Sequence, residues 1–482
     1  MLHKTTSIQI FIAIYLALTS VFSQKVTETR IIKGFLPIFE NNILSGFFMV
    51  AAEASQPKER SFYITKCDVN LGVIATFVEK RNPDDEVGSM AFNNKALCVV
   101  YSSKRENEFV VYDPAQLKVI KRHMPPQNSA LFEHTGAEFS KLYAYENNGF
   151  FFNKYTIDDK IICHFIGLDN TLRKTWEFKS NLGFEGQNVI PYTEKVHSEK
   201  YFVNHITRKK NAISPNNRNP SLIINSTQNG QLILHNNYDK PEELLFVDYP
   251  KVYVDDTLDV ACLVGDYLDL KSKSRGWMLS KMDLKNKTKT NQFVEYNGAE
   301  IQKFLDMEYQ SRASKNHLGL LPYAVHKFNE GYVITGEIYE AKPKNLIEFG
   351  LEGPQEGYSQ SIFFCELDKD FRIVSFKYYD VADHKVNPKS KDARYTTAFS
   401  GSILDSRYDK AHGRVELLYL QDVSEKEVEY LKLVYGTDRV ISNSFKKSFK
   451  RQGAHEQLNI FEGVTKFTVF RMRNGLLEIT QE

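Results

Sequence analysis

The stretch Phe363-Phe364-Cys365-Glu366-Leu367-Asp368 is followed by a second run, Phe371 to Tyr378, in which apolar and polar residues alternate. The same phrase occurs in Phe165-Ile166-Gly167-Leu168-Asp169, followed by Leu172 to Phe178. Alternation with a period of two predicts β-strands, and an Asp between two such runs predicts a turn. A hairpin that recurs along a chain is typical of repeat arrays such as propellers and solenoids.

Turn residues set the number of repeats. We expect the chain to reverse direction seven times in equivalent hairpins, at Asp68, Asp113, Asp169, Asn229-Gly230, Asp283, Asp368 and Asp438. Apolar or alternating runs around these turns predict strands at Phe47–Ala52, Phe62–Cys67, Ala96–Tyr101, Phe109–Tyr112, Ile161–Phe165, Leu222–Asn225, Leu232–Leu234, Val260–Val264, Tyr332–Ile338, Val415–Leu420 and Phe467–Met472. Short helical turns are predicted only at Asn42–Met49 and Ala299–Glu308.

An array of small sheets must protect its terminal edges, and a ring does so when strands from both chain ends complete one unit. We therefore expect an all-β fold, a β-propeller with seven blades, with six or eight allowed. The N-terminal strand Arg30–Leu36 and the C-terminal hairpin Phe467–Ile479 are the expected closing strands. A pair of stacked β-sandwich domains is the alternative that the same alternation allows.

The N-terminus has the pattern of a secretory signal peptide. Lys4 precedes the apolar run Ile10–Leu18, and small residues surround the end of the segment at Ser23. The run is too short for a membrane-spanning helix, which needs roughly 20 apolar residues. We expect residues 1–23 to be removed and residues 24–482 to form a single β-propeller domain that is exported to the periplasm, cell surface or extracellular space. A retained N-terminal membrane anchor is the alternative.

Charge and cysteine content exclude some classes of function. Lys and Arg number 62 against 60 Asp and Glu, which argues against nucleic-acid binding. No integral membrane segment is expected in the mature chain. The five cysteines, at 67, 98, 163, 262 and 365, follow no zinc or compact disulfide spacing, so we expect mostly buried free thiols, with one disulfide between neighbouring strands as the alternative.

The segment Gly331–Glu337, with the hairpin that follows it, resembles the repeat of exported bacterial propellers. In that repeat a glycine-led strand precedes an apolar strand, a Leu-Asp turn and a further apolar strand, and Leu168–Trp176 matches its second half. The signal peptide ending in Ser23-Gln24 is similar to those of exported proteins of the Bacteroidota. The whole chain resembles the uncharacterised exported β-propeller-like proteins of that group, which implies fold and export and no particular activity.

Two clusters of charged residues are candidate ligand sites. Asp255, Asp256 and Asp259 could hold a hard cation or act on a sugar, but the Gly and closing Glu of a calcium loop are missing, which favours a solvated turn before Val260–Val264. Arg208, Lys209 and Lys210 could receive an anionic glycan or a sulfate, with a solvated loop as the alternative. No Gly-x-Ser-x-Gly motif and no zinc-spaced histidine pair occurs, so no catalytic residue, metal site or cofactor is predicted.

These observations favour an exported, non-catalytic β-propeller that binds a protein or glycan partner through loops on one face. The segments Thr207–Pro220, Asp306–Pro322 and Ala341–Ser359 are the expected inserted loops. The alternative is a glycoside hydrolase or lyase whose carboxylates converge at the central channel, because residues far apart in sequence meet only in the fold. A structural component of an envelope assembly is a third hypothesis.

Overall fold

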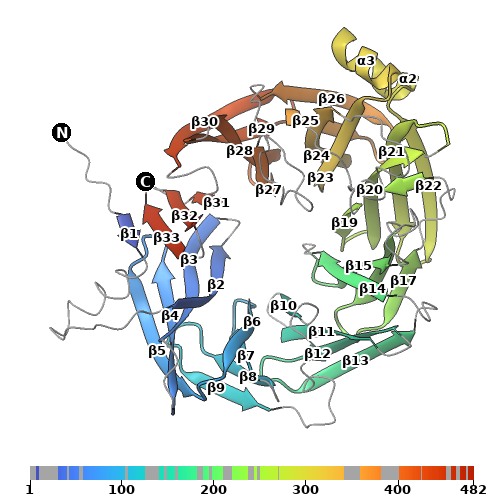
Figure 1. Cartoon of the computed structure of the whole chain (residues 1–482). Helices are drawn as coiled ribbons and strands as arrows, with labels where there is room; N and C mark the ends of the chain where they lie inside the picture. Colours follow the sequence, from blue (N-terminus) through green and yellow to red (C-terminus); the bar gives the residue numbers. More distant parts are fainter. Residues whose placement is uncertain are drawn as a thin grey trace, which may run out of the picture. The chain divides into compact units, whose positions relative to one another are not determined.

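Figure 1 shows a computed structural model of the chain. The structure describes residues 7–9, 31–40, 43–53, 58–103, 107–124, 141–145, 149–157, 161–181, 188–194, 198–209, 220–236, 244–246, 250–269, 271–340, 359–381, 401–424, 426–451, 457–462, 467–473 and 476–481. The described chain is almost entirely β-structure, and its strands form consecutive antiparallel sheets. It divides into two compact units.

Unit 1 comprises Met1–Glu185, Thr227–Gly230 and His455–Glu482. It holds four sheets, each of four strands in the order of the chain except where the two termini meet. They are sheet 1, β2 (Ile31–Glu40), β3 (Ile43–Ala52), β4 (Arg60–Asp68) and β5 (Val73–Arg81); sheet 2, β6 (Glu86–Phe92), β7 (Leu97–Ser102), β8 (Asn107–Tyr112) and β9 (Val119–His123); sheet 3, β10 (Lys141–Tyr145), β11 (Gly149–Ile157), β12 (Ile161–Leu168) and β13 (Lys174–Asn181); and sheet 8, β31 (Gln457–Glu462), β32 (Phe467–Arg473), β33 (Leu476–Gln481) and β1 (Ser7–Gln9).

Unit 2 comprises Gly186–Ser226 and Gln231–Ala454 and repeats the same design. Its sheets have four strands each, except that a fifth strand joins sheet 5. They are sheet 4, β14 (Asn188–Glu194), β15 (Tyr201–Lys209), β16 (Pro220–Ser226) and β17 (Leu232–Asn236); sheet 5, β18 (Leu244–Phe246), β19 (Lys251–Asp255), β20 (Val260–Asp269), β21 (Arg275–Asp283) and β22 (Thr288–Glu295); sheet 6, β23 (Leu318–Phe328), β24 (Gly331–Glu340), β25 (Ser359–Leu367) and β26 (Ile373–Asp380); and sheet 7, β27 (Gly401–Asp409), β28 (Arg414–Ser424), β29 (Glu427–Tyr435) and β30 (Ile441–Lys450).

This succession of four-stranded meanders confirms the predicted all-β, β-propeller fold class. All seven predicted reversals lie between the last two strands of sheets 1 to 7, and each of the predicted strands falls within an observed strand, except that Ala96 precedes β7 by one residue. The terminal strands form a further sheet, so the described residues contain seven four-stranded sheets and one of five strands. The predicted role of Arg30–Leu36 in closure is wrong, because this segment belongs to β2 in sheet 1, and β1 pairs with β33 instead.

The turn at Asp169 shows why Asp recurs at these reversals. Its Oδ1 accepts hydrogen bonds from the backbone N–H of Thr171 at 2.7 Å and of Arg173 at 3.0 Å. Asp68 and Asp368 accept from the equivalent two amides in their own hairpins. Such side-chain bonds satisfy amides that a tight turn leaves unpaired, so these carboxylates act in the turn itself.

The third residue after each of these Asp residues has a left-handed backbone. Leu71, Leu172 and Phe371 have φ of 61°, 61° and 64°. This conformation costs an apolar residue roughly 1–2 kcal/mol. Leu172 is only 3% exposed and Phe371 only 6%, and burial of such side chains contributes about 1.5–3 kcal/mol each, which offsets the strain. The turn therefore reverses the chain and also buries an apolar side chain against the sheet.

Sheet 2 is buried on both faces, as β7 shows directly. Leu97, Val99 and Tyr101 pack into a cluster with sheet 1, whereas Cys98 and Val100 pack into a cluster with sheet 3. Adjacent residues of a strand point to opposite faces. A continuous apolar run such as that of β7 is thus a strand whose two faces pack against two neighbouring sheets.

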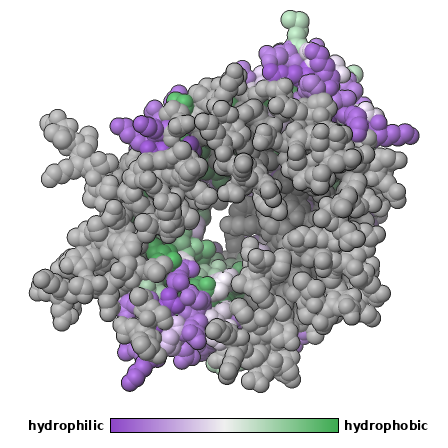
Figure 2. All heavy atoms as spheres, viewed as in Figure 1, coloured by the Kyte–Doolittle hydropathy of each residue, from purple (hydrophilic) through white to green (hydrophobic). Residues whose placement is uncertain are grey.

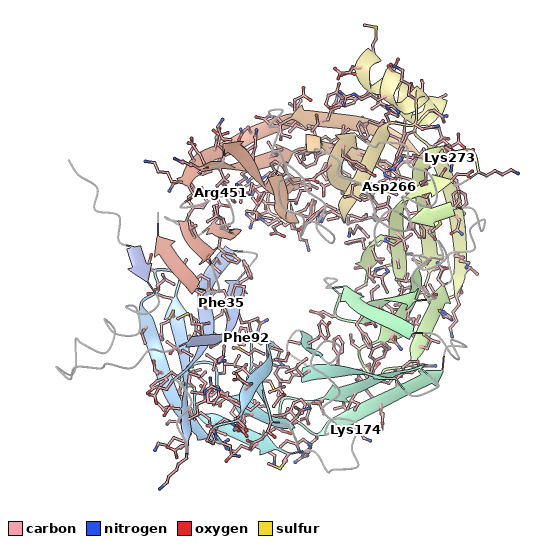
Figure 3. All side chains as sticks on the ribbon, in the orientation of Figure 1. Phe35, Phe92, Lys174, Asp266, Lys273 and Arg451 are labelled. Atoms are coloured by element: carbon pink, nitrogen blue, oxygen red, sulfur yellow. The ribbon has the colours of Figure 1, made fainter. Side chains whose placement is uncertain are left out.

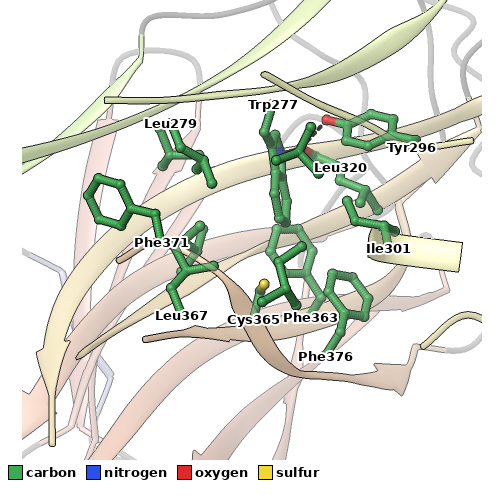
Figure 4. Close-up of a cluster of buried hydrophobic side chains, with 14 of the residues drawn as sticks. Trp277, Leu279, Tyr296, Ile301, Leu320, Phe363, Cys365, Leu367, Phe371 and Phe376 are labelled. Atoms are coloured by element: carbon green, nitrogen blue, oxygen red, sulfur yellow. Dashed lines mark hydrogen bonds between the residues drawn. The ribbon is translucent and has the colours of Figure 1, made fainter. Parts of the chain in front are cut away.

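The largest cluster lies between sheets 5 and 6 and is shown in Figure 4. Trp277 is fully buried in it, and its Nε1–H donates a 2.7 Å hydrogen bond to the carbonyl of Leu320 on β23. Its ring meets Tyr296 edge on at 5.9 Å and Phe363 at 5.4 Å. These contacts join the two sheets in one core.

First strands of unit 1 carry apolar side chains that are partly exposed. Figure 2 shows apolar residues gathered where β2 and β6 lie, and Figure 3 labels Phe35 and Phe92 on these strands. The two strands approach closely, because a side chain on Gly34 of β2 would meet Met90 Sδ of β6 at 2.3 Å.

Helical structure is confined to one connection among the described residues. α2 (Ala299–Gln302) and α3 (Met307–Ser314) follow β22, as predicted for Ala299–Glu308, whereas the predicted helical turn at Asn42–Met49 is wrong because β3 occupies it. The expected loop Asp306–Pro322 is also wrong, since α3 and the start of β23 lie there. Tyr309 of α3 packs edge on against Tyr378 of β26 at 5.1 Å, so the helix covers the last strand of sheet 6.

The cysteine prediction is confirmed for the four residues whose side chains are described. Cys67, Cys98, Cys262 and Cys365 are buried free thiols. Burial raises the pKa of Cys67 and Cys262 to about 12, which makes these thiols unreactive. In the described part of the chain, no helix combines the length and apolar character needed to cross a membrane.

We expect Asp169→Ala to destabilise the protein by about 1 kcal/mol, because the amides of Thr171 and Arg173 lose their acceptor. Asp169→Asn retains one acceptor oxygen and should lose less stability. Urea denaturation, with hydrogen exchange of the β12–β13 hairpin, measures both. Equal stability of Asp169→Ala and the wild type would contradict this account of the turn.

The same turn should be sensitive to acid. Partial burial opposes the charge of Asp169, but hydrogen bonds from Thr171 and Arg173 outweigh it and lower its pKa. A carboxyl with a lowered pKa stabilises the fold above its ordinary pKa and loses this contribution as the pH falls through the folded value. The stability difference between the wild type and Asp169→Asn should therefore shrink on acidification.

Candidate functional site

The predicted acidic cluster forms a junction between sheets 4 and 5. Asp255 is buried at the end of β19, and its Oδ1 accepts from the backbone N–H of Thr257 at 3.0 Å and of Leu258 at 3.1 Å. Asp256 accepts from Ser198 Oγ at 2.5 Å and from the backbone N–H of Glu199 at 2.7 Å. These carboxylates thus satisfy backbone and hydroxyl donors of the chain itself.

Asp259 completes this junction. Lys200 Nζ donates to its Oδ1 at 3.0 Å, and Tyr201 Oη donates to the same oxygen at 2.9 Å. The hydrogen bonds from Lys200 and Tyr201 lower the pKa of Asp259, while burial, followed by the bond to Asp259, raises the pKa of Tyr201 to about 12. Ligand binding by Asp255, Asp256 and Asp259 stays a prediction, and the structure assigns each carboxylate an internal contact.

The predicted basic cluster cannot be placed as a site. Arg208 and Lys209 lie at the end of β15, but their side chains fall outside the described residues, as does all of Lys210. Most of the expected loops Thr207–Pro220 and Ala341–Ser359 also lie outside the described residues. Their part in binding stays a prediction.

A different group of polar side chains lies between the first strands of sheets 6 and 7. We call it the β23–β27 site and define it as Tyr323, His326, Thr335 and Ser406. The Nε2 of His326 on β23 lies 2.7 Å from Ser406 Oγ on β27, and Thr335 Oγ1 on β24 lies 2.9 Å from the same oxygen. Tyr323 is 38% exposed, and His326 and Ser406 are partly exposed. The site offers an aromatic face beside hydroxyl and imidazole groups.

A Ser–His hydrogen bond by itself does not define a hydrolase. Catalysis by such a pair also requires a group that orients the imidazole and donors that stabilise the oxyanion. Ser406 Oγ is instead shared between His326 and the fully buried Thr335. The three side chains form a hydrogen-bonded chain that joins sheets 6 and 7.

Glu337 is a buried carboxyl close to this site along β24. It is 5% exposed, and its Oε1 has no hydrogen-bond partner in the structure as described. Residues two apart in a strand share a face, so Glu337 lies on the same face as Thr335, toward sheet 7. Burial raises its pKa from an ordinary 4.5 to about 8, and the side chain is therefore mainly protonated at pH 7.

Asp266, labelled in Figure 3, is also a buried carboxylate, but unlike Glu337 it has hydrogen-bond donors around it. It accepts from Tyr296 Oη at 2.8 Å and, across the boundary of sheets 5 and 6, from Tyr339 Oη at 2.9 Å. Arg275 Nη1 donates to Tyr339 Oη at 2.7 Å. Each carboxylate oxygen of Asp266 thus accepts a tyrosine hydroxyl, and a buried network of this kind stabilises the packing of two sheets.

Sequence reasoning missed both His326–Ser406 and Glu337. His326 and Ser406 are 80 residues apart, and nothing in their local sequence indicates that they meet. Glu337 did carry a signal, because a carboxylate at an inward position of the apolar strand Gly331–Glu337 must be neutral or paired. In the part of the chain that the structure describes, no group of three or more His, Cys, Asp or Glu residues could hold a metal ion.

No protein-family model matches the chain, and no curated protein matches it in sequence. Among solved structures, the WD40 domain of SCAP from fission yeast is 8% identical, with a TM-score of 0.39 over 95% of this chain and 96% of that one. The β-propeller domain of the Trilobed protease from Pyrococcus furiosus is 9% identical, with a TM-score of 0.40 over 83% of this chain and 93% of that one. The WD40 domain of coronin from Toxoplasma gondii is 8% identical, with a TM-score of 0.35 over 82% of this chain and 80% of that one. Similarity at this level indicates no particular ligand.

We expect Glu337→Gln to change how stability depends on pH. A carboxyl whose pKa rises on folding destabilises the native state as the pH increases from its ordinary 4.5 toward about 8. The variant should therefore gain stability over the wild type between pH 5 and pH 9, by on the order of a few kcal/mol. Urea denaturation at both pH values measures the gain, and the exposed Glu330→Gln serves as the control. Parallel pH profiles of wild type and Glu337→Gln would show that Glu337 is not buried in this way.

Tyr339→Phe should destabilise the protein by about 1–3 kcal/mol, because Asp266 loses one of its two hydroxyl donors while it stays buried. The matched control is Tyr323→Phe, whose hydroxyl is partly exposed and makes a longer bond of 3.4 Å to the Leu404 carbonyl. We expect a change within about 0.5 kcal/mol for this control. An equal loss of stability in the two variants would show that the hydrogen bond from Tyr339 to Asp266 stabilises the protein no more than the exposed hydroxyl of Tyr323 does.

Proposed function

We propose that this chain is an exported β-propeller that binds a protein or glycan partner without chemically altering it. Export rests on the signal-peptide pattern of residues 1–23 and on the resemblance to exported proteins of the Bacteroidota. The nearly equal numbers of acidic and basic residues support a partner other than nucleic acid.

The observation that carries the binding proposal is the β23–β27 site. Binding sites for small ligands combine an apolar or aromatic surface with a few polar groups that fix orientation. Tyr323 supplies the aromatic surface, while His326 and Ser406 supply an imidazole and a hydroxyl that are partly open to solvent. The hydrogen bonds within the site hold these groups in place on strands, so little ordering is needed when a ligand binds.

A glycan fits this composition best. Sugar rings present apolar C–H faces that pack on an aromatic ring, and hydroxyls that exchange hydrogen bonds with neutral polar side chains. Imidazole and hydroxyl groups can each donate or accept, which suits hydroxyl-rich ligands. We therefore take a neutral glycan as the first ligand to test at the β23–β27 site.

Glu337 favours one alternative, a glycoside hydrolase. A buried carboxyl that stays protonated near pH 7 is the type of group that donates a proton to a leaving sugar. The reaction also needs a second carboxyl about 5–10 Å away. Cleavage of a bound glycan that Glu337→Gln abolishes would support this alternative, whereas unchanged glycan after long incubation supports binding alone.

Tyr323→Ala and His326→Ala should each weaken glycan binding about tenfold or more, which corresponds to about 1.4 kcal/mol. A defined glycan array identifies the ligand, and isothermal titration calorimetry measures its affinity for each variant. Lys174→Ala is the control, because this residue lies on the surface of β13 in unit 1 and pairs there with Glu177 (Figure 3). Unchanged affinity in both site variants would exclude the β23–β27 site as the binding site.

A further inference from the structure

Three contacts join β23 to β27 in unit 2, one at each end of a shared segment and one at its centre. In chain order the pairs are Tyr323 with Leu404, His326 with Ser406 and Phe328 with Tyr408. The first two are hydrogen-bond contacts of 3.4 and 2.7 Å, and the third is an edge-on contact of two rings whose centroids lie 6.4 Å apart. Residue numbers increase together in the three pairs, so the two strands run in the same direction along this segment.

A β-bulge in each strand marks one end of the segment. The pairing register shifts around Tyr323 in β23 and around Leu404 in β27. The extra residue of a bulge falls outside the regular alternation of the strand, and its side chain can be directed differently from its neighbours. Tyr323 is accordingly 38% exposed, although Pro322 before it is buried. The bulges thus present an aromatic ring at this end of the segment.

Side chains that are open to solvent follow the segment from end to end. We call Tyr323, His326, Ser406 and Tyr408 the β23–β27 row; Tyr323 is exposed, and the other three are partly exposed. Tyr408 lies two residues after Ser406, so both side chains lie on the face of β27 toward sheet 6. The row therefore has an aromatic ring at each end and hydrogen-bonding groups at its centre.

The charged residues beside the row are directed away from it. Lys327 and Arg407 directly follow the two central residues, and adjacent residues of a strand point to opposite faces. Lys327 Nζ lies 4.8 Å from the ring centroid of Tyr332, in the core shared with sheet 5, and Arg407 donates two hydrogen bonds of 3.0 and 2.9 Å to Glu416. The exposed Asp405 lies on the same face of β27 as Arg407. This arrangement favours an uncharged ligand for the row.

The length of the row indicates a ligand of several units. Tyr408 lies four residues beyond Leu404, which corresponds to roughly 13 Å at about 3.3 Å per residue. Covalent bonds of about 1.5 Å give a six-membered sugar ring with its linking oxygen a length of about 5 Å. The row is thus too long for one sugar and matches about three linked units.

We propose that the β23–β27 row binds a linear, uncharged oligosaccharide of about three sugar units, an inference that rests on the glycan-binding part of the proposed function. One terminal unit packs on Tyr323 and the other on Tyr408, while the central unit exchanges hydrogen bonds with His326 and Ser406. An extended peptide would bind chiefly through backbone hydrogen bonds to a strand edge, whereas the groups that define this row are side chains.

A series of chain lengths tests this inference. An array of uncharged glucose, galactose, mannose and xylose oligomers, from the monosaccharide to the hexasaccharide, identifies the sugar that the full chain binds. Isothermal titration calorimetry then measures the affinity for each length of that sugar. The affinity should rise about tenfold or more from the monosaccharide to the trisaccharide and change by less than about twofold beyond it, because the row then has no further groups to contact.

Tyr408→Leu tests the far end of the row. Leucine keeps an apolar contact with Phe328 but removes the flat ring, so the affinity for the trisaccharide should fall about tenfold while that for the monosaccharide stays within about twofold. Tyr408→Phe keeps the ring and should keep the affinity for both. Tyr379→Ala is the matched control, because Tyr379 packs partly buried on the same core but lies on β26, the last strand of sheet 6. Urea denaturation verifies that each variant is folded.

The outcomes separate this inference from the proposed function. Binding of no sugar on the array overturns the glycan-binding part of the proposed function and this inference with it. Equal affinity for all lengths, or equal effects of Tyr408→Leu and Tyr379→Ala on the trisaccharide, overturns this inference alone and leaves a site for a single sugar unit. Binding of uncharged extended peptides in place of every sugar, lost in Tyr408→Leu, would show that the row takes a peptide and also overturns the inference.

Discussion

Burial of both faces of sheets 1, 2, 5 and 6 is the constraint on which the rest of this structure depends. Along β24 and β25, Ile334 and Phe363 pack into the core shared with sheet 5, whereas Val333, Ile362 and Phe364 pack into the core shared with sheet 7. Each of these sheets therefore contributes to two cores, and each core takes residues from two sheets. Polar atoms on such strands must find partners or stay neutral, because water reaches neither face.

The polar contacts between sheets follow from this constraint. Glu366 on β25 is 6% exposed and meets Arg439, in the turn between β29 and β30, through two hydrogen bonds of 2.8 and 3.0 Å. Asp266 is satisfied by two tyrosine hydroxyls in the same way. Glu337 lacks such a partner among the described residues and remains protonated instead. The β23–β27 site differs from all three because Tyr323, His326 and Ser406 lie on first strands and are partly open to solvent.

Local sequence predicted the hairpins well because their signals are local. The Asp residues at 68, 169 and 368 bond amides within four residues of themselves, and strand alternation repeats every two residues. Prediction from local sequence failed where tertiary contacts decide the structure. Asn42–Met49 has residues that a helix tolerates, yet Ile43–Met49 belongs to β3 and pairs with β2, and from Gly46 onward with β4 as well. The acidic cluster at 255–259 was recognised, but the donors to Asp256 and Asp259 come from Ser198–Tyr201, the segment that leads into β15 of sheet 4.

The sequence by itself determined the strands, their turns and the all-β fold class, because period-two alternation and Asx turns involve only neighbouring residues. Tertiary structure alone decided which strands share a core and which side chains meet. His326 and Ser406 come together across 80 residues only because β23 and β27 are first strands of adjacent sheets. Tertiary structure also decided which strands the N-terminal segments pair with. β2 belongs to sheet 1 and β1 pairs with β33, and backbone pairing at a sheet edge leaves little trace in the pattern of side chains.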